Sequence, residues 1–478
     1  MSNPVDRAQS DPSGENLAPD LAEAVHVHVI GIGGAGMSAI AEVLATMGHR
    51  VSGSDLKASA GLDRLRALGV EVHVGHDADH VGRADVVTRS TAVPDGNPEC
   101  REAAERTIPL LSRAEMLGAI TRLRRTVAVA GTHGKTTTAS MLALALRGAG
   151  LRPSFVIGGD VNEIGTGAAW DDGDLFVVEA DESDGSFLRL ESRMAVVTNL
   201  DPDHLEHHGG FEALRASFDE FVAGVDGPVV IGIDDPEGVA LADRSRSGGF
   251  DVRTVGTSAD ADWRIAELRE SWDGVGFVLR GPGTNLAVAL PVPGRHNARN
   301  AAAATVLALL AGAEPQAVAE ALSRFGGVAR RFEHRGRSGG VTLVDDYAHL
   351  PTEISATIRA ARTGDFDRLV AVFQPHRFSR TEALWSSFGP SFEGVDVLFV
   401  TDVYPSGEAP RPGVTGHLVV DAVRRDLPGV DVRYTARRDD LVDALMAELR
   451  SGDLCLTMGA GDLTSVPTDL RERLGSDA

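Results

Sequence analysis

The chain of 478 residues is long enough for about three domains of roughly 150 residues each. It carries 46 Lys and Arg against 69 Asp and Glu, a formal net charge of −23, with 43% hydrophobic and 24% charged residues. This is an ordinary globular composition, which excludes a disordered chain or a collagen. We expect no nucleic-acid partner, because binding to a phosphodiester backbone depends on an excess of Lys and Arg.

Cysteine usage and the hydrophobic runs indicate a cytoplasmic protein. The two cysteines, Cys100 and Cys455, lie far apart and lack metal-ligand spacing, which argues against disulfides and zinc. The longest apolar run, 301–313, is too short to cross a bilayer and predicts a buried helix. Residues 1–24 contain three prolines and no apolar core, so they predict a disordered tail rather than a signal peptide. We expect no membrane insertion, and the sequence does not distinguish a monomer from a dimer.

Short apolar runs alternate with helical patterns from residue 25 onward, which predicts an α/β fold with parallel sheets. The first unit has predicted strands at 27–30, near 51 and at 85–88. The second has them at 127–130, 175–178, 195–198 and 229–231, and the third at 341–344, 369–373, 397–400 and 454–457. Basic joints at 122–125 and 330–337 separate these units. We therefore expect a tail at 1–24 and domains at 25–124, 125–331 and 332–478.

A first glycine-rich turn follows the strand at 27–30. Gly31, Gly33 and Gly36 match G-x-G-x-x-G ahead of a helix, and Asp55 follows about twenty residues later. Such glycines let the backbone approach a diphosphate at the positive end of a helix. The pattern predicts a diphosphate site. It leaves open an NAD-dependent dehydrogenase module and a purely structural turn.

A second glycine-rich turn, 131–137, follows the strand at 127–130 and precedes a long apolar helix. Backbone N–H groups of such a loop surround the β- and γ-phosphates, Lys135 adds a positive charge, and the Thr136 hydroxyl can bind Mg²⁺. The usual P-loop would need glycine where Val129 stands, which argues against switch GTPases and transport ATPases. The turn predicts a P-loop ATPase domain.

Acidic residues follow two of the predicted strands. Glu179 comes directly after the strand at 175–178, where a nucleotide's Mg²⁺ is commonly held, and is the strongest metal candidate. Asp181, Glu182 and Asp184 are either further ligands or a solvated acidic loop. The segment 199–204, Asn-Leu-Asp-Pro-Asp-His, follows the next strand and is also able to bind metal.

In combination these motifs resemble the Mur ligase family. Those that carry the resemblance are Gly-Ile-Gly-Gly-Ala-Gly-Met-Ser (31–38), Gly-Thr-His-Gly-Lys-Thr-Thr (131–137), Glu-Ala-Asp-Glu-Ser-Asp (179–184), 199–204, Pro-Gly-Arg-His-Asn (293–297) with Asn300, Asp-Tyr-Ala-His (346–349) and Gln-Pro-His-Arg-Phe-Ser-Arg-Thr (374–381). They occur in the family's order, and the resemblance extends from around residue 26 to the C-terminus. It implies a Rossmann-like N-terminal domain for a UDP-sugar, a central P-loop ATPase domain with a mostly parallel sheet, and a Rossmann-like C-terminal domain that brings an amino acid.

The resemblance further implies an ATP-dependent ligase that joins L-alanine to the carboxylate of UDP-N-acetylmuramate during peptidoglycan synthesis. The carboxylate would attack the γ-phosphate of ATP to give an acyl phosphate, and the alanine amine would then displace phosphate. A recycling ligase that attaches a tripeptide to the same UDP-sugar shares most motifs and is the nearest alternative. A folate polyglutamate synthetase fits less well, because it lacks a domain with the first glycine turn.

Residue roles are carried over from the resemblance. ATP would contact Gly131, Thr132, His133, Gly134, Lys135, Thr136, Thr137, His296, Asn297, Asn300, Arg331 and Asp346. The UDP-sugar would contact Gly31, Gly33, Gly34, Gly36, Asp55 and Ser90, with the loop 97–99 beside them. The amino-acid side of the site would contain His349, His376, Arg377 and Arg380. Lys135, Glu179, His204 and Arg377 would be catalytic, and Thr136, Glu179 and His204 would hold two Mg²⁺ ions.

Two departures from the family pattern stand out. The family usually has a second histidine after His349, ahead of Pro-Thr-Glu, and here that residue is Leu350. We expect His349 to carry any polar role alone, and Leu350 to pack at the start of a helix opened by Pro351. Many sister ligases also use a carbamylated lysine, but no lysine follows Lys135 in this chain.

Overall fold

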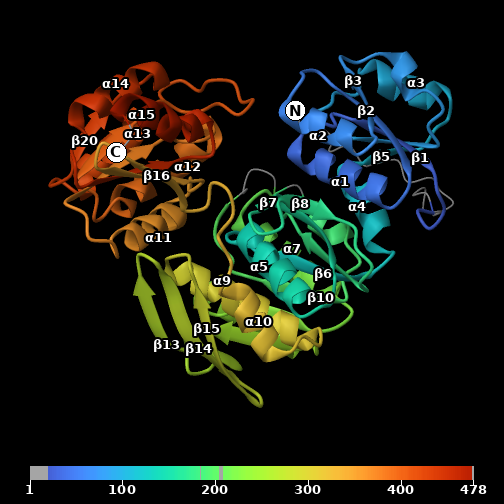
Figure 1. Cartoon of the computed structure of the whole chain (residues 1–478), viewed down its shortest axis with the longest axis horizontal. Coiled ribbons are helices and arrows are strands. Elements are labelled where there is room, and N and C mark those ends of the chain that lie inside the picture. Colours follow the sequence, from blue (N-terminus) through green and yellow to red (C-terminus); the bar gives the residue numbers. More distant parts are fainter. Residues whose placement is uncertain (1–19, 184, 204–207, 476–478) are drawn as a thin grey trace. The chain divides into compact units, whose positions relative to one another are not determined.

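The structure, a computed structural model, describes residues 20–183, 185–203 and 208–475 (Figure 1). The chain divides into two compact units. Among the described residues, the N-terminal unit comprises 20–125 with Ala168–Trp170 and Arg189–Glu191, and the main unit contains the others. The predicted tail falls mostly outside the described residues, as do Asp184 and His204. Residues 20–24 form a turn in which Leu21 is buried.

The N-terminal unit contains, among its described residues, a five-stranded parallel sheet in the order β3-β2-β1-β4-β5. Its strands are β1 (His26–Ile30), β2 (Arg50–Asp55), β3 (Glu71–Val74), β4 (Val86–Arg89) and β5 (Leu110–Ser112). Its helices are α1 (Ala35–Thr46), α2 (Ala60–Ala67), the 3-10 helix η1 (Ala78–Val81), α3 (Pro98–Glu105) and α4 (Arg113–Thr121). The strand order reverses between β1 and β4. Ligands of open α/β sheets bind at such a point, and the first glycine turn lies there.

The main unit begins with the central sheet, whose order over the described residues is β15-β14-β13-β12-β11-β10-β6-β9-β7-β8. Its strands are β6 (Arg125–Ala130), β7 (Ser154–Val161), β8 (Thr166–Ala169), β9 (Leu175–Glu179), β10 (Met194–Val197), β11 (Val229–Gly232), β12 (Val252–Gly256), β13 (Trp263–Ser271), β14 (Gly274–Gly281) and β15 (Thr284–Leu290). Strands β6 and β10 to β13 pair in parallel. The antiparallel pairs β13–β14–β15 extend the sheet, and the sequence patterns did not predict them.

Helices α5 (Lys135–Gly148), η2 (Ser186–Arg189), α7 (Phe211–Ala223), α8 (Pro236–Ser247), α9 (Arg295–Leu310) and α10 (Pro315–Leu322) accompany the central sheet. Helix α9 packs against α5 and α10 (Figure 1). Its run of four alanines from Ala301 is buried, and such small side chains allow neighbouring helices to approach closely. The predicted buried helix at 301–313 is therefore confirmed, although the helix itself ends at Leu310.

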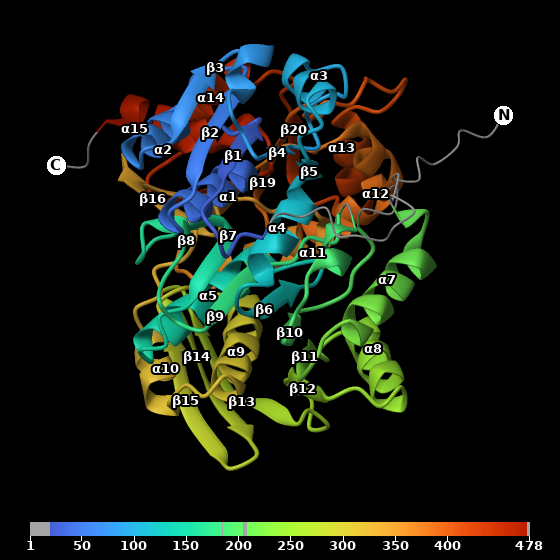
Figure 2. The same ribbon diagram turned by 90° about the vertical axis from the view of Figure 1, so that its right-hand side faces the viewer.

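The C-terminal part of the main unit forms a sheet in the order β16-β17-β21-β18-β19-β20, counted over the described residues. Its strands are β16 (Glu333–Ser338), β17 (Val341–Asp346), β18 (Arg368–Phe373), β19 (Val397–Val400), β20 (Asp431–Tyr434) and β21 (Asp453–Met458). Its helices are α11 (Pro351–Ala361), α12 (Phe378–Ser391), α13 (His417–Asp426), α14 (Arg438–Glu448), η3 (Asp462–Ser465) and α15 (Val466–Leu474). One apolar cluster joins the sheet to α11, α12 and α13, and another joins it to α14 and α15. Figure 2 labels these helices in a second view of the ribbon.

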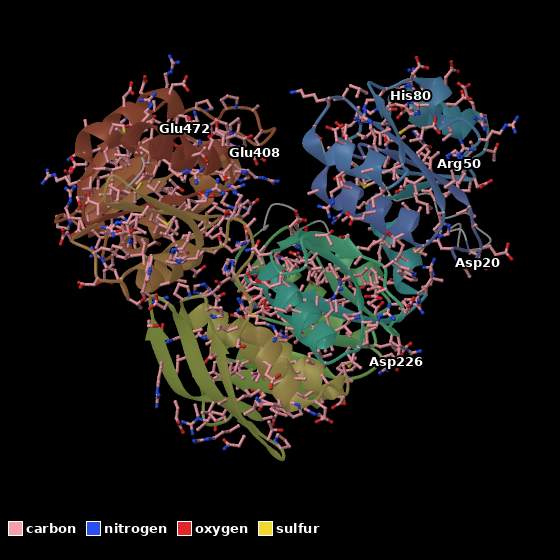
Figure 3. The ribbon with its side chains drawn as sticks, viewed as in Figure 1. Asp20, Arg50, His80, Asp226, Glu408 and Glu472 are labelled. Carbon is pink, nitrogen blue, oxygen red and sulfur yellow. The ribbon has the colours of Figure 1, made fainter. Side chains whose placement is uncertain are left out.

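The three sheets confirm the predicted α/β class with three domains. Charged side chains such as Arg50, Asp226 and Glu472 are exposed (Figure 3). Within the described part of the chain, no helix combines the length and apolar character needed to cross a membrane.

Candidate active site

The first glycine turn is held by hydrogen bonds to the last two residues of β2. The Gly31 N–H donates to the Ser54 carbonyl at 2.8 Å, and the Gly33 N–H donates to the Asp55 carboxylate at 2.9 Å. Gly31 has φ +78°, a conformation that favours glycine. A side-chain carbon on Gly33 would lie 2.8 Å from Asp55 Oδ2, so a larger residue would displace that carboxylate. The predicted residues Gly31, Gly33 and Asp55 thus form one structure.

Near this turn, the structure differs from the sequence-based expectation at Arg113 and at the segment 97–99. Arg113, which the motifs did not single out, places its guanidinium 2.5 Å from where a Cβ of Gly36 would lie. A cation at this point suits a diphosphate. The 97–99 loop is not a loop: Asn97 caps α3, and Glu99 is fully buried. Its carboxylate accepts from Ser54 Oγ at 2.6 Å and contacts His76 and His80, so it faces the interior.

The second glycine turn joins β6 to α5 and is tightly enclosed. Gly131 has φ +123°, and Gly134, with φ +79°, is the N-cap of α5. A Cβ on Gly131 would come 2.1 Å from Thr198 Oγ1, and one on Gly134 would come 2.6 Å from Asn300 Oδ1. Neither position has room for a side chain. The backbone can therefore adopt the phosphate-binding conformation only with glycine at both.

The residues after β10 hold this loop in place. The Asn199 side chain accepts from the His133 N–H at 2.9 Å and donates to the His133 carbonyl at 3.0 Å. Thr198 Oγ1 donates to the same carbonyl at 2.6 Å. The sequence marks the segment 199–204 as able to bind metal. Its first residue, Asn199, holds the loop, and His204 lies outside the described residues.

Lys135 lies against carboxylates at the start of α5. Its ammonium donates to Gly131 O at 2.8 Å and lies 2.7 Å from Glu182 Oε2, with the Glu182 side chain 1% exposed. Burial works against the charge, but Glu182 and Asp181 outweigh it and raise the pKa of Lys135 above its usual value. Lys135 is therefore charged at neutral pH. The acidic loop that the sequence left undecided thus provides its partner.

Thr136 and Glu179, the two predicted metal ligands within the described residues, are adjacent. The Thr136 hydroxyl donates to Glu179 Oε1 at 2.9 Å, and Gly158 N–H donates to Oε2 at 2.7 Å. Glu179 is the last residue of β9 rather than the first after it. The described residues contain no cluster of three or more His, Cys, Asp or Glu able to hold a metal. A hydroxyl and a carboxylate still suit Mg²⁺, which keeps several waters and phosphate oxygens among its ligands.

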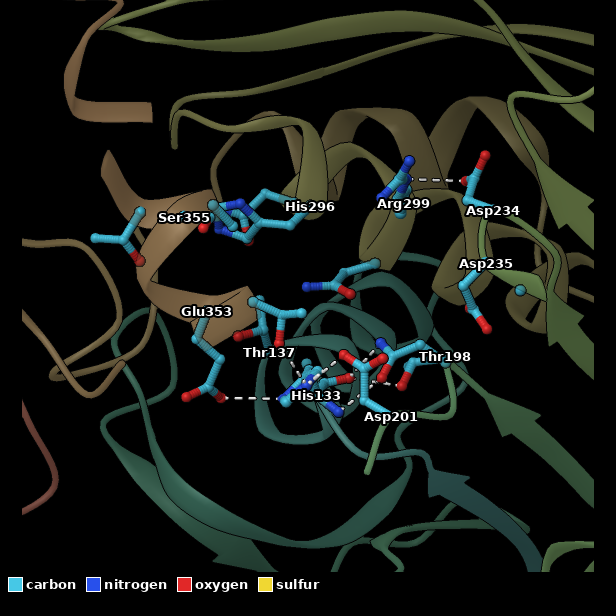
Figure 4. A pocket seen from close by; sticks show the side chains of 18 of the residues that line it. His133, Thr137, Thr198, Asp201, Asp234, Asp235, His296, Arg299, Glu353 and Ser355 are labelled. Carbon is cyan, nitrogen blue, oxygen red and sulfur yellow. Dashed lines mark hydrogen bonds and ion pairs between the residues drawn. The ribbon is translucent and has the colours of Figure 1, made fainter. Parts of the chain in front are cut away.

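A cavity of about 590 Å³ opens beside the loop (Figure 4). Eight of the predicted ATP contacts line it, and these are His133, Gly134, Thr137, His296, Asn297, Asn300, Arg331 and Asp346. Of the described loop residues, Gly131, Thr132, Lys135 and Thr136 lie outside its lining. Asp201, Asp234, Arg299 and Glu353 also line it, and the sequence did not mark them as contacts. The cavity thus joins residues of the central sheet to residues of α11.

Asp346 at the end of β17 organises the C-terminal wall of this cavity. Its two carboxylate oxygens accept from the N–H groups of Phe332 and Ala348, each at 2.7 Å. Burial raises the pKa of Asp346 to about 6, and Arg331 partly offsets this effect. The Arg331 guanidinium lies 4.8 Å from the centre of the Tyr347 ring. Asp346 and Arg331 therefore lie together at the cavity wall.

The predicted amino-acid contacts also gather in the main unit. The rings of His349 and His376 are 5.9 Å apart, and Arg380 Nη1 lies 3.3 Å from His376 Nδ1. Arg380 forms a buried ion pair with Asp203 at 3.1 Å. Burial lowers the pKa of His349 to about 4 and that of His376 to about 3, so both rings are neutral at pH 7. Arg377 caps α12 with φ +68°, which is uncommon for a residue other than glycine.

Three family models match the chain in succession. They are the Mur ligase family catalytic domain over residues 26–125, the Mur ligase middle domain over 129–308, and the Mur ligase glutamate ligase domain over 330–461. This chain belongs to the Mur ligase family. The match over 26–125 favours a ligase domain over an NAD-dependent dehydrogenase module.

Individual proteins of this family are also similar to this chain. The UDP-N-acetylmuramate–L-alanine ligase of Kineococcus radiotolerans is 49% identical over 446 residues, which is 92% of this chain and 94% of that protein. A crystal structure of UDP-N-acetylmuramate-alanine ligase from Thermotoga maritima matches with a TM-score of 0.78 and 28% identity, covering 94% of this chain and 99% of that one. The UDP-N-acetylmuramate:L-alanyl-gamma-D-glutamyl-meso-diaminopimelate ligase from Neisseria meningitides matches with a TM-score of 0.57 and 31% identity, covering 63% and 98%.

Proposed function

We propose that this protein is a ligase that uses ATP to join L-alanine to the carboxylate of UDP-N-acetylmuramate, releasing ADP and phosphate, in peptidoglycan precursor synthesis. The observation that carries the proposal is the convergence of the nucleotide loop, the α9 residues and the start of α11 on one cavity of the main unit. The choice of alanine rests on the 49% identity to an alanine ligase over 94% of its length. Among the solved structures, the tripeptide ligase has a lower TM-score than the alanine ligase, 0.57 against 0.78, and covers less of this chain, 63% against 94%, so it is the second choice.

The chemistry requires two anions to meet. The muramoyl carboxylate attacks the γ-phosphorus of ATP, the bond to the β–γ bridging oxygen breaks, and ADP leaves. Lys135 neutralises charge on the phosphates and on the transition state, where a preorganised cation is most effective. To do so, Lys135 gives up its contact with Glu182 and contacts the phosphate oxygens instead. The acyl phosphate then accepts the alanine amine, and phosphate leaves from the tetrahedral intermediate.

Thr136 and Glu179 are the proposed protein ligands of one Mg²⁺ ion, and His204 helps to hold a second. When bound, the ions reduce the repulsion between the phosphates and the carboxylate. The side chains fit this role in chemistry, since both Thr136 and Glu179 offer oxygen atoms at the edge of the loop.

The amino acid is proposed to bind near His349, His376, Arg377 and Arg380. A guanidinium can hold a carboxylate or a phosphoryl group with two parallel hydrogen bonds. Arg377 and Arg380 are the candidates for the alanine carboxylate and the phosphoryl group, and Arg380 also forms an ion pair with Asp203. The UDP-sugar is proposed to bind at Gly31, Gly33, Gly34, Gly36, Asp55 and Ser90, and also at Arg113, whose guanidinium lies beside Gly36.

We also propose domain boundaries at 25–124, 125–331 and 332–478, which place each sheet in one domain. A cytoplasmic location fits the two buried free cysteines and the need for ATP and a UDP-sugar.

The test is an assay of purified protein with ATP, Mg²⁺ and UDP-N-acetylmuramate, offering L-alanine or the L-Ala-D-Glu-diaminopimelate tripeptide. We expect phosphate release and a product heavier by one alanine residue by mass spectrometry. Preferential use of the tripeptide would instead identify the recycling ligase. Phosphate release without either product would contradict both.

A further inference from the structure

A hydrogen-bonded bridge connects the nucleotide loop to the first turn of α11. His133 Nδ1 lies 3.2 Å from Glu353 Oε1 (Figure 4). His133 Nε2 lies 3.1 Å from the Thr352 hydroxyl. The same Nε2 lies 2.9 Å from Asp201 Oδ2. The imidazole of the loop is therefore held between a carboxylate of the central domain and two side chains of the C-terminal domain.

Glu353 uses its other oxygen to order the segment that contains His349. Oε2 accepts from the His349 N–H at 3.0 Å and from the Leu350 N–H at 3.2 Å. The N-cap of α11 is Leu350, whose apolar side chain cannot accept from the first N–H groups of the helix. Glu353, the third residue of the helix, accepts the Leu350 N–H and so supplies one half of a capping box. One carboxylate thus binds both the nucleotide loop and the backbone of a residue proposed to lie on the amino-acid side.

The bridge is enclosed and charged. The side chains of His133 and Glu353 are 16% and 14% exposed. Burial works against a charged imidazole, but Asp201 and Glu353 outweigh it and raise the pKa of His133 to about 9. Hydrogen bonds that involve ionised partners are roughly twice as strong as neutral ones. The contact therefore joins two ions rather than two neutral groups.

We propose that Glu353 is a positioning residue that couples the nucleotide loop to the amino-acid side of the site through His133 and His349. This inference rests on the proposed function. The acyl phosphate forms at the loop, and the amine must reach it from the α11 side. Without the bridge, only a fraction of the molecules hold the nucleotide loop and the start of α11 in the arrangement that the reaction needs. The apparent affinity for the amino acid then falls by that fraction.

The test is Glu353→Gln, because glutamine keeps one oxygen for the capping bonds and replaces the other with an amide N–H. We expect the KM for L-alanine to rise about tenfold, with kcat at saturating alanine and the KM for UDP-N-acetylmuramate changed less than about threefold. The matched control is Glu115→Gln. Glu115 occupies the same capping position in α4, accepting from the Ser112 N–H at 2.8 Å, and should leave all three constants within about twofold.

A double variant tests whether His133 and Glu353 act through one contact. His133→Asn should raise the KM for L-alanine by a similar factor, and the double variant should be no worse than the single ones. A double variant whose KM for L-alanine rises by the product of the two single effects would overturn the proposal. So would a fall in kcat alone together with a lower melting temperature, which indicates only a weakened helix.

Failure of the inference is distinguishable from failure of the proposed function. A wild-type protein that does not use L-alanine contradicts the proposed function. An active wild type whose Glu353→Gln variant has an unchanged KM for L-alanine contradicts the bridge alone.

Discussion

At the scale of single residues, the nucleotide loop depends on side chains that have separate tasks. Asn199 and Thr198 hold the loop, Lys135 carries its charge, and Thr136 contacts Glu179. Of these, the sequence pointed to Lys135, Thr136 and Glu179, because their chemistry is tied to a motif or to the end of a predicted strand. The scaffolding roles of Thr198 and Asn199 depend on the pairing of β6 with β10, which brings residues far apart in the chain into contact.

Lys135→Ala should abolish ligation while leaving the binding of UDP-N-acetylmuramate nearly intact. The lysine provides a charge for the transition state, and its removal should lower the rate by about a hundredfold or more. The first glycine turn lies in the other unit and keeps its own contacts. Steady-state kinetics and calorimetric titration of the UDP-sugar measure the two effects.

The control for this variant is Arg147→Ala, which removes a positive charge from the exposed far end of the same helix. It should retain activity within about twofold. Activity of Lys135→Ala within about threefold of the wild type would contradict the phosphate role.

The charged state of His133 should appear in the dependence of stability on pH. Its pKa is raised from the ordinary 6.5 to about 9 in the folded protein. A raised pKa contributes stability that is complete below about 6.5 and is lost as the pH rises through about 9. We expect the melting temperature of the wild type to fall more between pH 7 and pH 10 than that of His133→Asn. Parallel curves for the two proteins would show that the imidazole is not charged.

At the scale of elements, the first turn of α11 explains why Leu350 is tolerated. Its side chain is 3% exposed and packs at the start of the helix opened by Pro351, as predicted. Glu353 accepts the Leu350 N–H at this helix start. Leu350 is not one of the residues that line the cavity, so a histidine in the same orientation would lie outside the lining.

Leu350→His should change kcat/KM by less than about threefold and lower the melting temperature, because it gives up apolar burial worth roughly 1.5–3 kcal/mol. His349→Ala should lower kcat/KM by at least about tenfold. Both effects are measurable by steady-state kinetics and thermal unfolding. A large gain in activity from Leu350→His would identify the second histidine as catalytic.

At the scale of the whole molecule, the cavity is lined by both the central and the C-terminal domain. Ligands that fill such a cavity favour the closed arrangement. We expect the radius of gyration to decrease when UDP-N-acetylmuramate and a non-hydrolysable ATP analogue are added together. Small-angle scattering of the free and doubly liganded protein measures this change. An unchanged radius would contradict ligand-driven closure.

The sequence by itself determined the α/β class, the order of the three domains and the two glycine turns, because strand periodicity and glycine spacing are local properties. The predicted strands at 127–130, 195–198 and 397–400 lie where the structure has β6, β10 and β19. Only the tertiary structure decided which polar side chains meet. The pairing of Glu353 with His133, of Arg380 with Asp203 and of Lys135 with Glu182 joins residues 220, 177 and 47 positions apart. No local pattern encodes such pairs, since packing of the elements alone brings them within hydrogen-bond distance.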